Sequence, residues 1–354
     1  MIPLPTSKED LTPEWFTSIL RLAKDNHVES VDLQPLGEQD SVSGYIYRAK
    51  LSYHNKTQDN PESVVLKLPH PHNLRAQWLL EAYRNEVMFY RTLAPTIGIL
   101  VPRLIHSDIV AETGDYILVI EDFPDSTNVR DETGATPVQA YKLLENIAKL
   151  HARHWQDQEV GSKLLGFENS INLLLTGLAR TPIFLTRFNL YIQPEDRQVF
   201  QALQGGFKAA VQPLIDSPKT IVHNDYSMKN ILMVDRGGES TFVLVDWANL
   251  RWGPGARDLG YFIMTSVPHH LRPMGEWAFL RYYWERLRIE GVHDYSFEQL
   301  LDDYRRCILM DMARMVMLGG GEFISPMYES ITRHLILGRT GSASELNLIS
   351  LFET

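Results

Sequence analysis

The stretch IVHNDYSMKNILMV, residues 221–234, places a histidine, an aspartate and an asparagine at fixed spacing between two apolar runs. His223, Asp225 and Asn230 fit the pattern H-x-D-x-x-x-x-N, and Asp246 ends the next apolar run, TFVLVDW. One carboxylate can orient an attacking hydroxyl and accept its proton, while an amide and a second carboxylate supply the oxygen ligands that magnesium prefers. The four residues together therefore favour phosphoryl transfer.

The two apolar runs are predicted to form a hairpin. The turn DRGGES, residues 235–240, has the glycine-rich chemistry of a tight β-turn. Phe242, Leu244 and Asp246 alternate along the second strand, so Asp246 is predicted to end an apolar row and to point into a cleft. A plain hairpin with solvated turn residues is the alternative, and it explains any one of these positions better than all of them together.

The wider pattern predicts two lobes. A chain of 354 residues is long for a single core. Short apolar strands dominate the first third, whereas long helical periods follow Pro137. We predict an α+β, protein-kinase-like two-lobed fold with a small antiparallel-sheet lobe at residues 1–123 and a larger helical lobe at 124–354. The predicted strands are 28–36, 45–53, 63–69, 101–110 and 116–123, and the predicted helices are 75–94, 138–155, 195–215, 274–290, 297–318 and 325–338.

Composition narrows the classes of function. The net charge of −10 argues against broad binding to nucleic-acid phosphates. The sequence shows neither an export signal at its start nor an apolar run long enough to cross a membrane, so we expect a cytoplasmic protein without a membrane partner. The single cysteine, Cys307, excludes an internal disulfide and a cysteine-based zinc site, and its helical setting predicts that it fills the core.

Phosphoryl transfer requires a lysine for the nucleotide phosphates and an acid to hold that lysine. Lys67 lies inside the apolar strand SVVLKLP, where a lone ammonium would be costly. The downstream helix offers Glu81 on a largely polar face and Glu86 on the apolar stripe. We predict a pair between Lys67 and Glu86, with Lys67 snorkelling to the surface as the alternative.

Two further segments are expected to contact the nucleotide. The segment LGEQDSVSGYIYRAK offers Ser43 and Gly44, whose backbone could approach phosphate, although it lacks the repeated glycines of a protein-kinase loop. The strand that joins the lobes, VIEDFPD, would present the carbonyl of Glu121 and the N–H of Phe123 to the base edge. This second expectation rests on topology rather than on side chains.

These motifs resemble the aminoglycoside phosphotransferase and choline kinase-like family, which has the protein-kinase-like fold. The resemblance rests on IVHNDYSMKNILM, on LVDWANLRWGPGARDLGYFI and on the Lys67 and Glu86 positions. It implies that Asp225 is the base, that Asn230 and Asp246 bind magnesium, and that Asp258 supports the catalytic loop.

Two details of the motif depart from related patterns. Asn224 stands where protein kinases usually carry arginine and where glycine is common in the resembled family. His223 is expected to be a structural hydrogen-bonding residue beneath the loop. The segments LTPEWFTSIL, IEDF and AKLHARHW resemble the ecdysteroid-kinase-like branch of the family more than they resemble the antibiotic-resistance enzymes.

Other chemistry-bearing residues have plainer interpretations. His151 and His154 share a helix face and could pair on a metal, but no carboxylate accompanies them, so packing is the preferred role. LGGGEF, residues 318–323, joins two helices without a preceding strand or a P-loop lysine, which favours an interhelical turn.

The leading hypothesis is an ATP- and magnesium-dependent phosphotransferase that acts on a hydroxyl of a small molecule. The alternatives are a catalytically silent nucleotide-binding scaffold of the same fold and a metal-dependent phosphoesterase built on His223, Asp225 and Asp246, which would leave Lys67 and Glu86 without a role. The helical lobe contains aromatic residues and acids that allow either an apolar alcohol or a cationic acceptor. The oligomeric state is not readable from the sequence. The residues considered for the acceptor are Trp252, Tyr261, Phe262, Glu276, Trp277, Tyr282, Tyr283, Trp284, Asp302 and Asp303.

Overall fold

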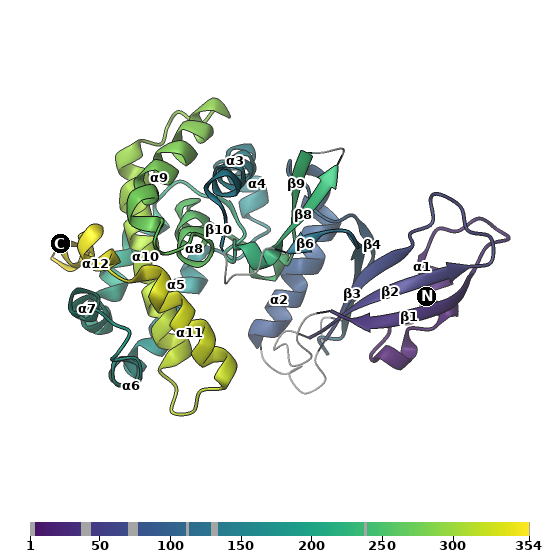
Figure 1. The fold of residues 1–354 in the computed structure, drawn as a ribbon, viewed down its shortest axis with the longest axis horizontal. Helices are drawn as coiled ribbons and strands as arrows, with labels where there is room; N and C mark the ends of the chain where they lie inside the picture. Colours follow the sequence, from purple (N-terminus) through teal and green to yellow (C-terminus); the bar gives the residue numbers. More distant parts are fainter. Residues whose placement is uncertain are drawn as a thin grey trace. The chain divides into compact units, whose positions relative to one another are not determined.

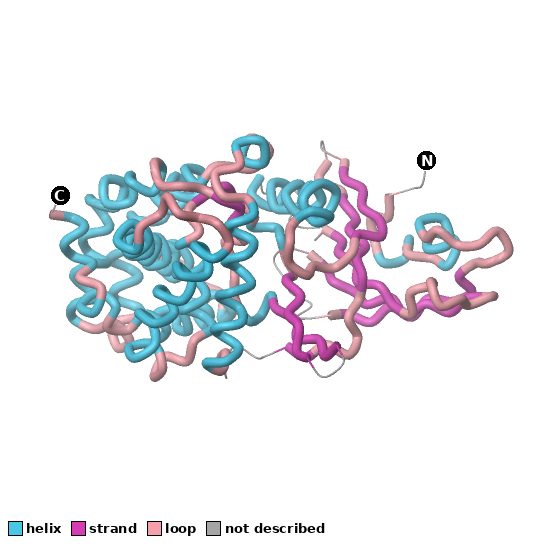
Figure 2. Tube along the Cα trace, turned by 90° about the horizontal axis from the view of Figure 1, so that it is seen from above, coloured by secondary structure: helices cyan, strands magenta, loops and turns pink. Residues whose placement is uncertain are grey.

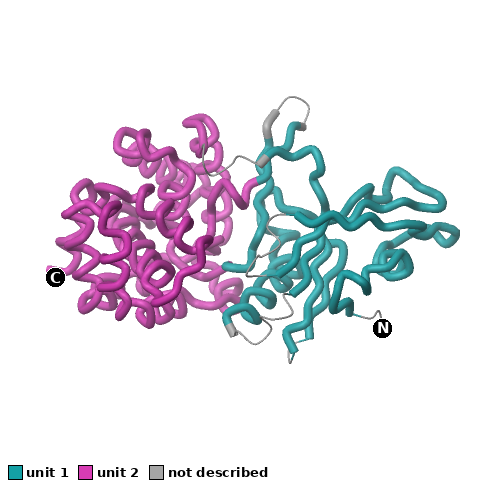
Figure 3. Tube along the Cα trace, turned by 60° about the horizontal axis from the view of Figure 1, so that its bottom comes forward, with its two compact units in different colours: residues 1–127, 232–249 teal, residues 128–231, 250–354 magenta. Residues whose placement is uncertain are grey.

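The computed structural model describes residues 4–36, 44–69, 77–110, 113–128, 134–236 and 239–353. Contacts divide the chain into two compact units, one made of residues 1–127 with 232–249 and the other of 128–231 with 250–354 (Figure 3). The first unit holds the large sheet, and the second is mainly helical (Figures 1 and 2). The first stretch of the sheet unit ends close to the predicted boundary at residue 123, and the unit also includes the hairpin at residues 232–249.

The first unit is built on a five-stranded antiparallel sheet with the strand order β1-β2-β3-β5-β4. All five predicted strands are present, each within a residue or a few of its expected ends. The strands are β1 (Val28–Pro35), β2 (Tyr45–Tyr53), β3 (Ser63–Leu68), β4 (Leu104–Ile109) and β5 (Tyr116–Glu121). A smaller sheet has the order β6-β8-β9, with β6 (Thr127–Asn128), β8 (Ile231–Arg236) and β9 (Glu239–Leu244).

Alternation along β3 places Lys67 on the opposite face of the sheet from the main core. Val64, Leu66 and Leu68 are buried in one cluster with side chains of α1 (Pro13–Ile19). Because successive strand residues point to opposite faces, Lys67 turns away from that cluster. The helix α1 begins after the N-cap residue Thr12, whose hydroxyl accepts from the Trp15 N–H at 3.3 Å.

Helix α2 (Gln77–Met88) continues into a π-helical turn, Phe89–Leu93, so most of the predicted helix 75–94 is present. The hairpin β8–β9 leads back to this helix. The ring of Trp247 stacks on Phe89 with centroids 3.9 Å apart, and the Leu244 N–H donates to the Leu100 carbonyl at 3.1 Å. These contacts explain why residues 232–249 belong to the sheet unit.

The second unit is a helical assembly in which α10 packs against α5, α7, α8 and α11, and α3 packs against α9. Two short strands, β7 (Thr220–Val222) and β10 (Arg251–Gly253), pair antiparallel, and β7 leads into the loop at residues 223–230. The helices are α3 (Pro137–Arg153), α4 (Gln158–Gly161), α5 (Phe167–Gly177), α6 (Thr181–Arg187), α7 (Pro194–Val211), α8 (Ala256–Ser266), α9 (Arg272–Ile289), α10 (Phe297–Gly319), α11 (Pro326–Arg339) and α12 (Ser342–Glu345).

The five long helices predicted for this unit correspond to α3, α7, α9, α10 and α11. Capping explains two of their starts, because Thr136 and Ser296 each form a capping box with the glutamine three residues later. The helices α5, α6 and α8 and the strand β10 were not expected from the sequence. Within the described ranges, none of the helices is both long enough and apolar enough to cross a membrane.

Candidate active site

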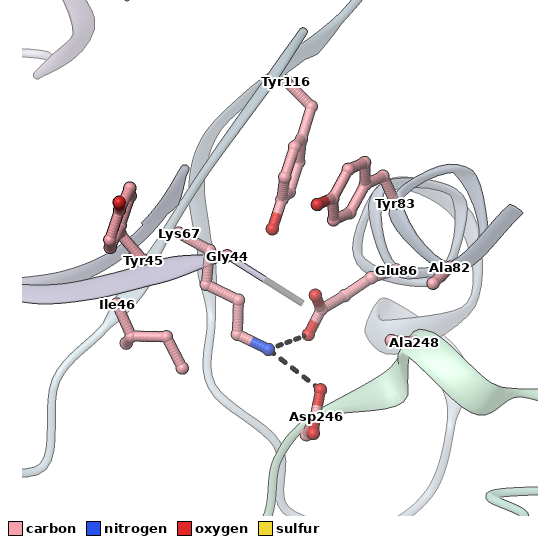
Figure 4. Close-up of a pocket in the computed structure, with 10 residues that line it drawn as sticks. All are labelled: Gly44, Tyr45, Ile46, Lys67, Ala82, Tyr83, Glu86, Tyr116, Asp246 and Ala248. Atoms are coloured by element: carbon pink, nitrogen blue, oxygen red, sulfur yellow. Dashed lines mark hydrogen bonds and ion pairs between the residues drawn. The ribbon is translucent and has the colours of Figure 1, made fainter. Parts of the chain in front are cut away.

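Lys67 lies at the centre of a pocket in the sheet unit. Its Nζ is 2.7 Å from Glu86 Oε1 on α2 and 3.0 Å from Asp246 Oδ1 after β9 (Figure 4). The predicted pairing of Lys67 with Glu86 is therefore confirmed. Glu81, the polar-face alternative, is not among the residues that line this pocket in the described part of the chain. The pocket is lined by Gly44, Tyr45, Ile46, Lys67, Ala82, Tyr83, Glu86, Tyr116, Asp246 and Ala248.

Burial controls the ionisation of this pair. Desolvation by itself would lower the pKa of Lys67, but the carboxylates of Asp246 and Glu86 outweigh it and raise that pKa. Burial raises the pKa of Glu86, and the Lys67 ammonium opposes this rise. The lysine is thus held as a cation at physiological pH. Because Glu86 and Asp246 both contact the Lys67 ammonium, a phosphate that binds Lys67 must share or replace one of these two contacts.

Asp246 reaches this pocket by a different route from the predicted one. The strand β9 ends at Leu244, and Asp246 has a φ of +65°, in the left-handed region. The expected alternation of Phe242, Leu244 and Asp246 on one strand face therefore stops before Asp246. A turn rather than strand parity directs its carboxylate towards Lys67.

Gly44 lies beside the same pocket, and its environment explains the glycine. Its φ is +136°, and a Cβ atom there would lie 2.2 Å from the Leu68 carbonyl oxygen. The neighbouring strand thus excludes any side chain at this position. Ser43, the other residue predicted in this segment, lies outside the described residues.

Glu121 and Phe123 lie where β5 leaves the sheet. The Glu121 N–H donates to the Arg103 carbonyl, and its side chain accepts from the Arg103 N–H at 3.1 Å. Phe123 is buried, and its carbonyl accepts from the Ser126 N–H. Neither residue is among those that line the Lys67 pocket in the described ranges, and their contact with a nucleotide base stays a prediction.

Asp225 is a buried carboxylate on the loop at residues 223–230 of the helical unit. Its Oδ2 accepts from the Asn230 side-chain amide at 3.1 Å and lies 3.1 Å from Lys229 Nζ. Burial would raise the pKa of Asp225, but the charges of Lys229 and Arg314 and the Tyr261 hydroxyl help to lower it to about 2. Asp225 is therefore ionised at neutral pH, as a group that orients a hydroxyl must be.

Asp258 holds the backbone of this loop. Its two carboxylate oxygens accept from the N–H groups of His223 at 2.8 Å and Asn224 at 2.7 Å, and His151 Nε2 lies 3.3 Å away. This geometry fits the supporting role that the resemblance implies. His151 is thus a buried hydrogen-bonding residue, since its other ring nitrogen contacts the Tyr283 hydroxyl.

Asn224 occupies a strained backbone position. Its φ is +62°, a region that glycine enters freely and that asparagine tolerates better than most residues. Arg257 donates to the Asn224 side-chain oxygen at 2.9 Å and forms an ion pair with Asp311. The departure from glycine is therefore stabilised by a side-chain contact. The ring of His223 makes an edge contact with Tyr226 beneath the loop.

Lys229 and Arg314 are functional candidates that sequence reasoning missed. Lys229 is visible in the motif as the residue four positions after Asp225, a spacing that brings the two side chains together. Arg314 comes from α10, far along the chain, and no local pattern connects it with the loop.

His154 is buried near the end of α3, and its two ring nitrogens have no hydrogen-bond partner among the described residues.

Comparison with known proteins gives a family match. The profile of the phosphotransferase enzyme family (APH) matches residues 50–292, which contain Lys67, Glu86 and Asp246 and the stretch 221–234. A search of curated protein sequences found no match.

Solved structures give the same fold. Choline kinase from Cryptosporidium parvum Iowa II is 10% identical, with a TM-score of 0.56 and coverage of 97% of this chain and 96% of that one. The gentamicin complex of APH(2″)-IIa is 14% identical, with a TM-score of 0.53 and coverage of 98% and 97%. LicA in complex with AMP is 16% identical, with a TM-score of 0.51 and coverage of 96% and 97%. At these identities the likeness establishes a protein-kinase-like phosphotransferase fold.

Proposed function

The chain belongs to the phosphotransferase enzyme family and is an enzyme of the small-molecule kinase class, and from this premise we propose that it transfers the γ-phosphate of ATP to a hydroxyl group of a small molecule with the help of magnesium. The observation that carries the proposal is the buried, ionised Asp225 on a loop whose backbone Asp258 holds. Such a carboxylate can hold an acceptor hydroxyl in line for attack.

Proton transfer follows from the chemistry of Asp225. A carboxylate with a pKa of about 2 is a weak base towards an alcohol in the ground state. It accepts the hydroxyl proton as the new oxygen–phosphorus bond forms, when that proton becomes acidic. Its first contribution is thus orientation, and proton acceptance completes the step.

Asn230 and Asp246 would hold magnesium. The Asn230 amide nitrogen donates to the backbone carbonyl of Asp225 at 2.9 Å, which turns the amide oxygen away from Asp225. An amide oxygen and a carboxylate oxygen are hard donors of the kind that magnesium takes. When bound, the ion would neutralise charge that develops on the phosphates.

Lys67 would bind the nucleotide phosphates while Glu86 keeps it in place. We expect phosphate to replace Asp246 as a partner of Lys67, which frees the Asp246 carboxylate for the metal. The complex of the structurally similar LicA with AMP supports the choice of a nucleotide. Glu121 and Phe123 are proposed to meet its base, and Gly44 to lie near its phosphates.

A small-molecule acceptor is supported by the names of two structural neighbours, a choline kinase and a gentamicin complex. The ecdysteroid-kinase-like branch remains a prediction within this proposal. The boundary of the nucleotide-binding part is proposed to follow the sheet unit, including residues 232–249.

The test is magnesium-dependent ATP binding followed by ADP release against pooled hydroxylated compounds. Asp225→Asn is the control, because it keeps the shape of the side chain and removes its charge. We expect ADP release with at least one pool, at a rate that falls by 100-fold or more, roughly, in the control. ATP binding should survive in the control. An absence of ATP binding in the wild-type chain would refute the assignment.

A further inference from the structure

Two cationic side chains, Lys229 and Arg314, flank the carboxylate of Asp225. Lys229 Nζ is 3.1 Å from Asp225 Oδ2, and nearly half of its side chain is exposed. The guanidinium of Arg314 lies over the ring of Tyr261, 5.0 Å from its centroid, and its charge acts on Asp225 as well. One carboxylate thus faces two cations, which leaves the immediate surroundings of the proposed base positive.

The hydrogen-bond donors of Arg314 are uncommitted. Within the described part of the chain, its guanidinium makes no hydrogen bond and no ion pair, although the side chain is only half-exposed. A guanidinium carries five N–H donors in a planar fork, so a half-buried one without partners is suited to a ligand. Other buried or half-buried arginines of this unit are engaged: Arg257 with Asp311, Arg272 with Glu276, Arg305 with the Leu346 carbonyl, Arg306 with Asp302 and Arg339 with Glu276.

The acids that could have bound a cationic acceptor are already engaged. Glu276 contacts Arg272 and Arg339, and Asp302 pairs with Arg306 at 2.7 Å. Asp303 accepts from the hydroxyl groups of Ser217 and Tyr295.

Two of the candidate aromatic residues, Trp284 and Tyr283, are similarly occupied. The guanidinium groups of Arg281 and Arg288 lie over the Trp284 ring, 5.4 and 5.0 Å from its centroid. Tyr283 bonds to His151. The three acids and these two aromatic rings are therefore engaged by the protein itself, whereas Trp277 is exposed.

We propose that the acceptor is a hydroxy compound with an acidic group, a carboxylate or a phosphate, which the Arg314 guanidinium binds while Lys229 adds favourable charge. This inference rests on the proposed kinase function and identifies its substrate class. The planar fork of arginine matches two oxygens of such a group, so binding there would also fix the orientation of the molecule. An amino alcohol at the same place would meet two like charges.

The chemical step balances with this acceptor. The acceptor hydroxyl oxygen forms a bond to the γ-phosphorus of ATP, and the bond from that phosphorus to the bridging oxygen breaks. ADP leaves with the bonding electron pair. The hydroxyl proton passes to Asp225 and then to water. The acidic group on Arg314 takes no part in bond making.

The experiment uses matched trios of acid, neutral alcohol and amine: glycerate, glycerol and serinol; gluconate, sorbitol and glucamine; phenyllactate, 3-phenylpropane-1,2-diol and phenylalaninol. Two readouts are taken with the whole chain. One is ADP release with magnesium and ATP, and the other is thermal stabilisation by each compound in the presence of a nonhydrolysable ATP analogue. Asp225→Asn, Arg314→Met, Arg314→Lys and Arg281→Met are compared with the wild type. Arg281→Met is the matched control, since Arg281 also lies over aromatic rings of this unit.

We expect the hydroxy acid of at least one trio to exceed its amine in kcat/KM by about 10-fold or more. Arg314→Met should raise KM for that acid by roughly 10- to 100-fold, while KM for ATP stays within about twofold. Arg314→Lys should restore part of the loss, because it returns the charge without the fork. Arg281→Met should behave as the wild type.

The outcomes separate the two proposals. Amines that outperform their matched acids would overturn the inference and leave the kinase assignment intact. An Arg314→Met loss that falls on ATP rather than on the acid would also overturn it. A third outcome is that hydroxy acids stabilise the wild type but not Arg314→Met, while no ADP release depends on Asp225. This result would support the acidic ligand and refute the proposed reaction.

Discussion

Replacing Lys67 by methionine would leave a buried carboxylate without its cation. The side chain of Glu86 is 2% exposed, and its oxygen lies 2.7 Å from Lys67 Nζ. Removing one partner of a buried ion pair destabilises a protein by about 3–5 kcal/mol. With a urea m-value of about 3 kcal/mol per molar, the unfolding midpoint of Lys67→Met should fall by about 1–1.7 M.

The double variant Lys67→Met/Glu86→Leu tests the cause. Replacing both charges by apolar side chains of similar size is often neutral or stabilising, so the double variant should recover to within about 1 kcal/mol of the wild type. Asp246 is partly exposed and can be solvated in both variants. Both variants should lose magnesium-dependent ATP binding, which separates the role of Lys67 in folding from its role with the nucleotide.

The deficit of Lys67→Met should depend on pH. Burial raises the pKa of Glu86, and without Lys67 nothing on β3 opposes this rise. The folded pKa then exceeds the unfolded value, so no penalty exists below the unfolded pKa of about 4.3, and the penalty grows as pH rises above it. Urea titrations at several pH values should therefore show a smaller deficit in acid. Equal destabilisation of the single and double variants, or a deficit of Lys67→Met that does not grow with pH, would refute the reasoning.

Three other variants test the remaining parts of the site. Asp246→Asn should abolish magnesium-dependent ATP binding in a calorimetric titration but keep the fold, because Lys67 retains Glu86; unchanged affinity for magnesium-ATP would contradict the metal role. Asp258→Asn should lower the free energy of unfolding in urea by about 2–3 kcal/mol, since an amide nitrogen would face a backbone N–H of the loop at residues 223–230. It should also change kcat more than KM for ATP, and a wild-type kcat would argue against the supporting role of Asp258. Burial lowers the pKa of His154, so part of the unfolding free energy should be lost as pH falls through 6.5, and His154→Leu should make that loss shallower; an unchanged pH profile would count against a neutral buried histidine.

Much of the architecture could be predicted because it depends on local patterns. Alternation along β3 put Lys67 in a strand, and the apolar stripe of α2 selected Glu86 over Glu81 as its partner. The spacing of Asp225 and Asn230 in the motif brings them together through a short 3₁₀ turn, so their contact needs little from the rest of the chain.

Contacts between distant segments decided the rest. The sequence by itself determined the strands of the first unit, five long helices of the second and the residues that carry the proposed chemistry, because periodicity and short-range spacing act within a few residues. Only the tertiary structure placed the hairpin with the sheet, through the stacking of Trp247 on Phe89, and aimed Asp246 by a left-handed turn. Only the packing of α10 brought Arg314 towards Asp225. Burial and charge at a site are sums over elements that lie far apart along the chain, so they emerge when those elements pack.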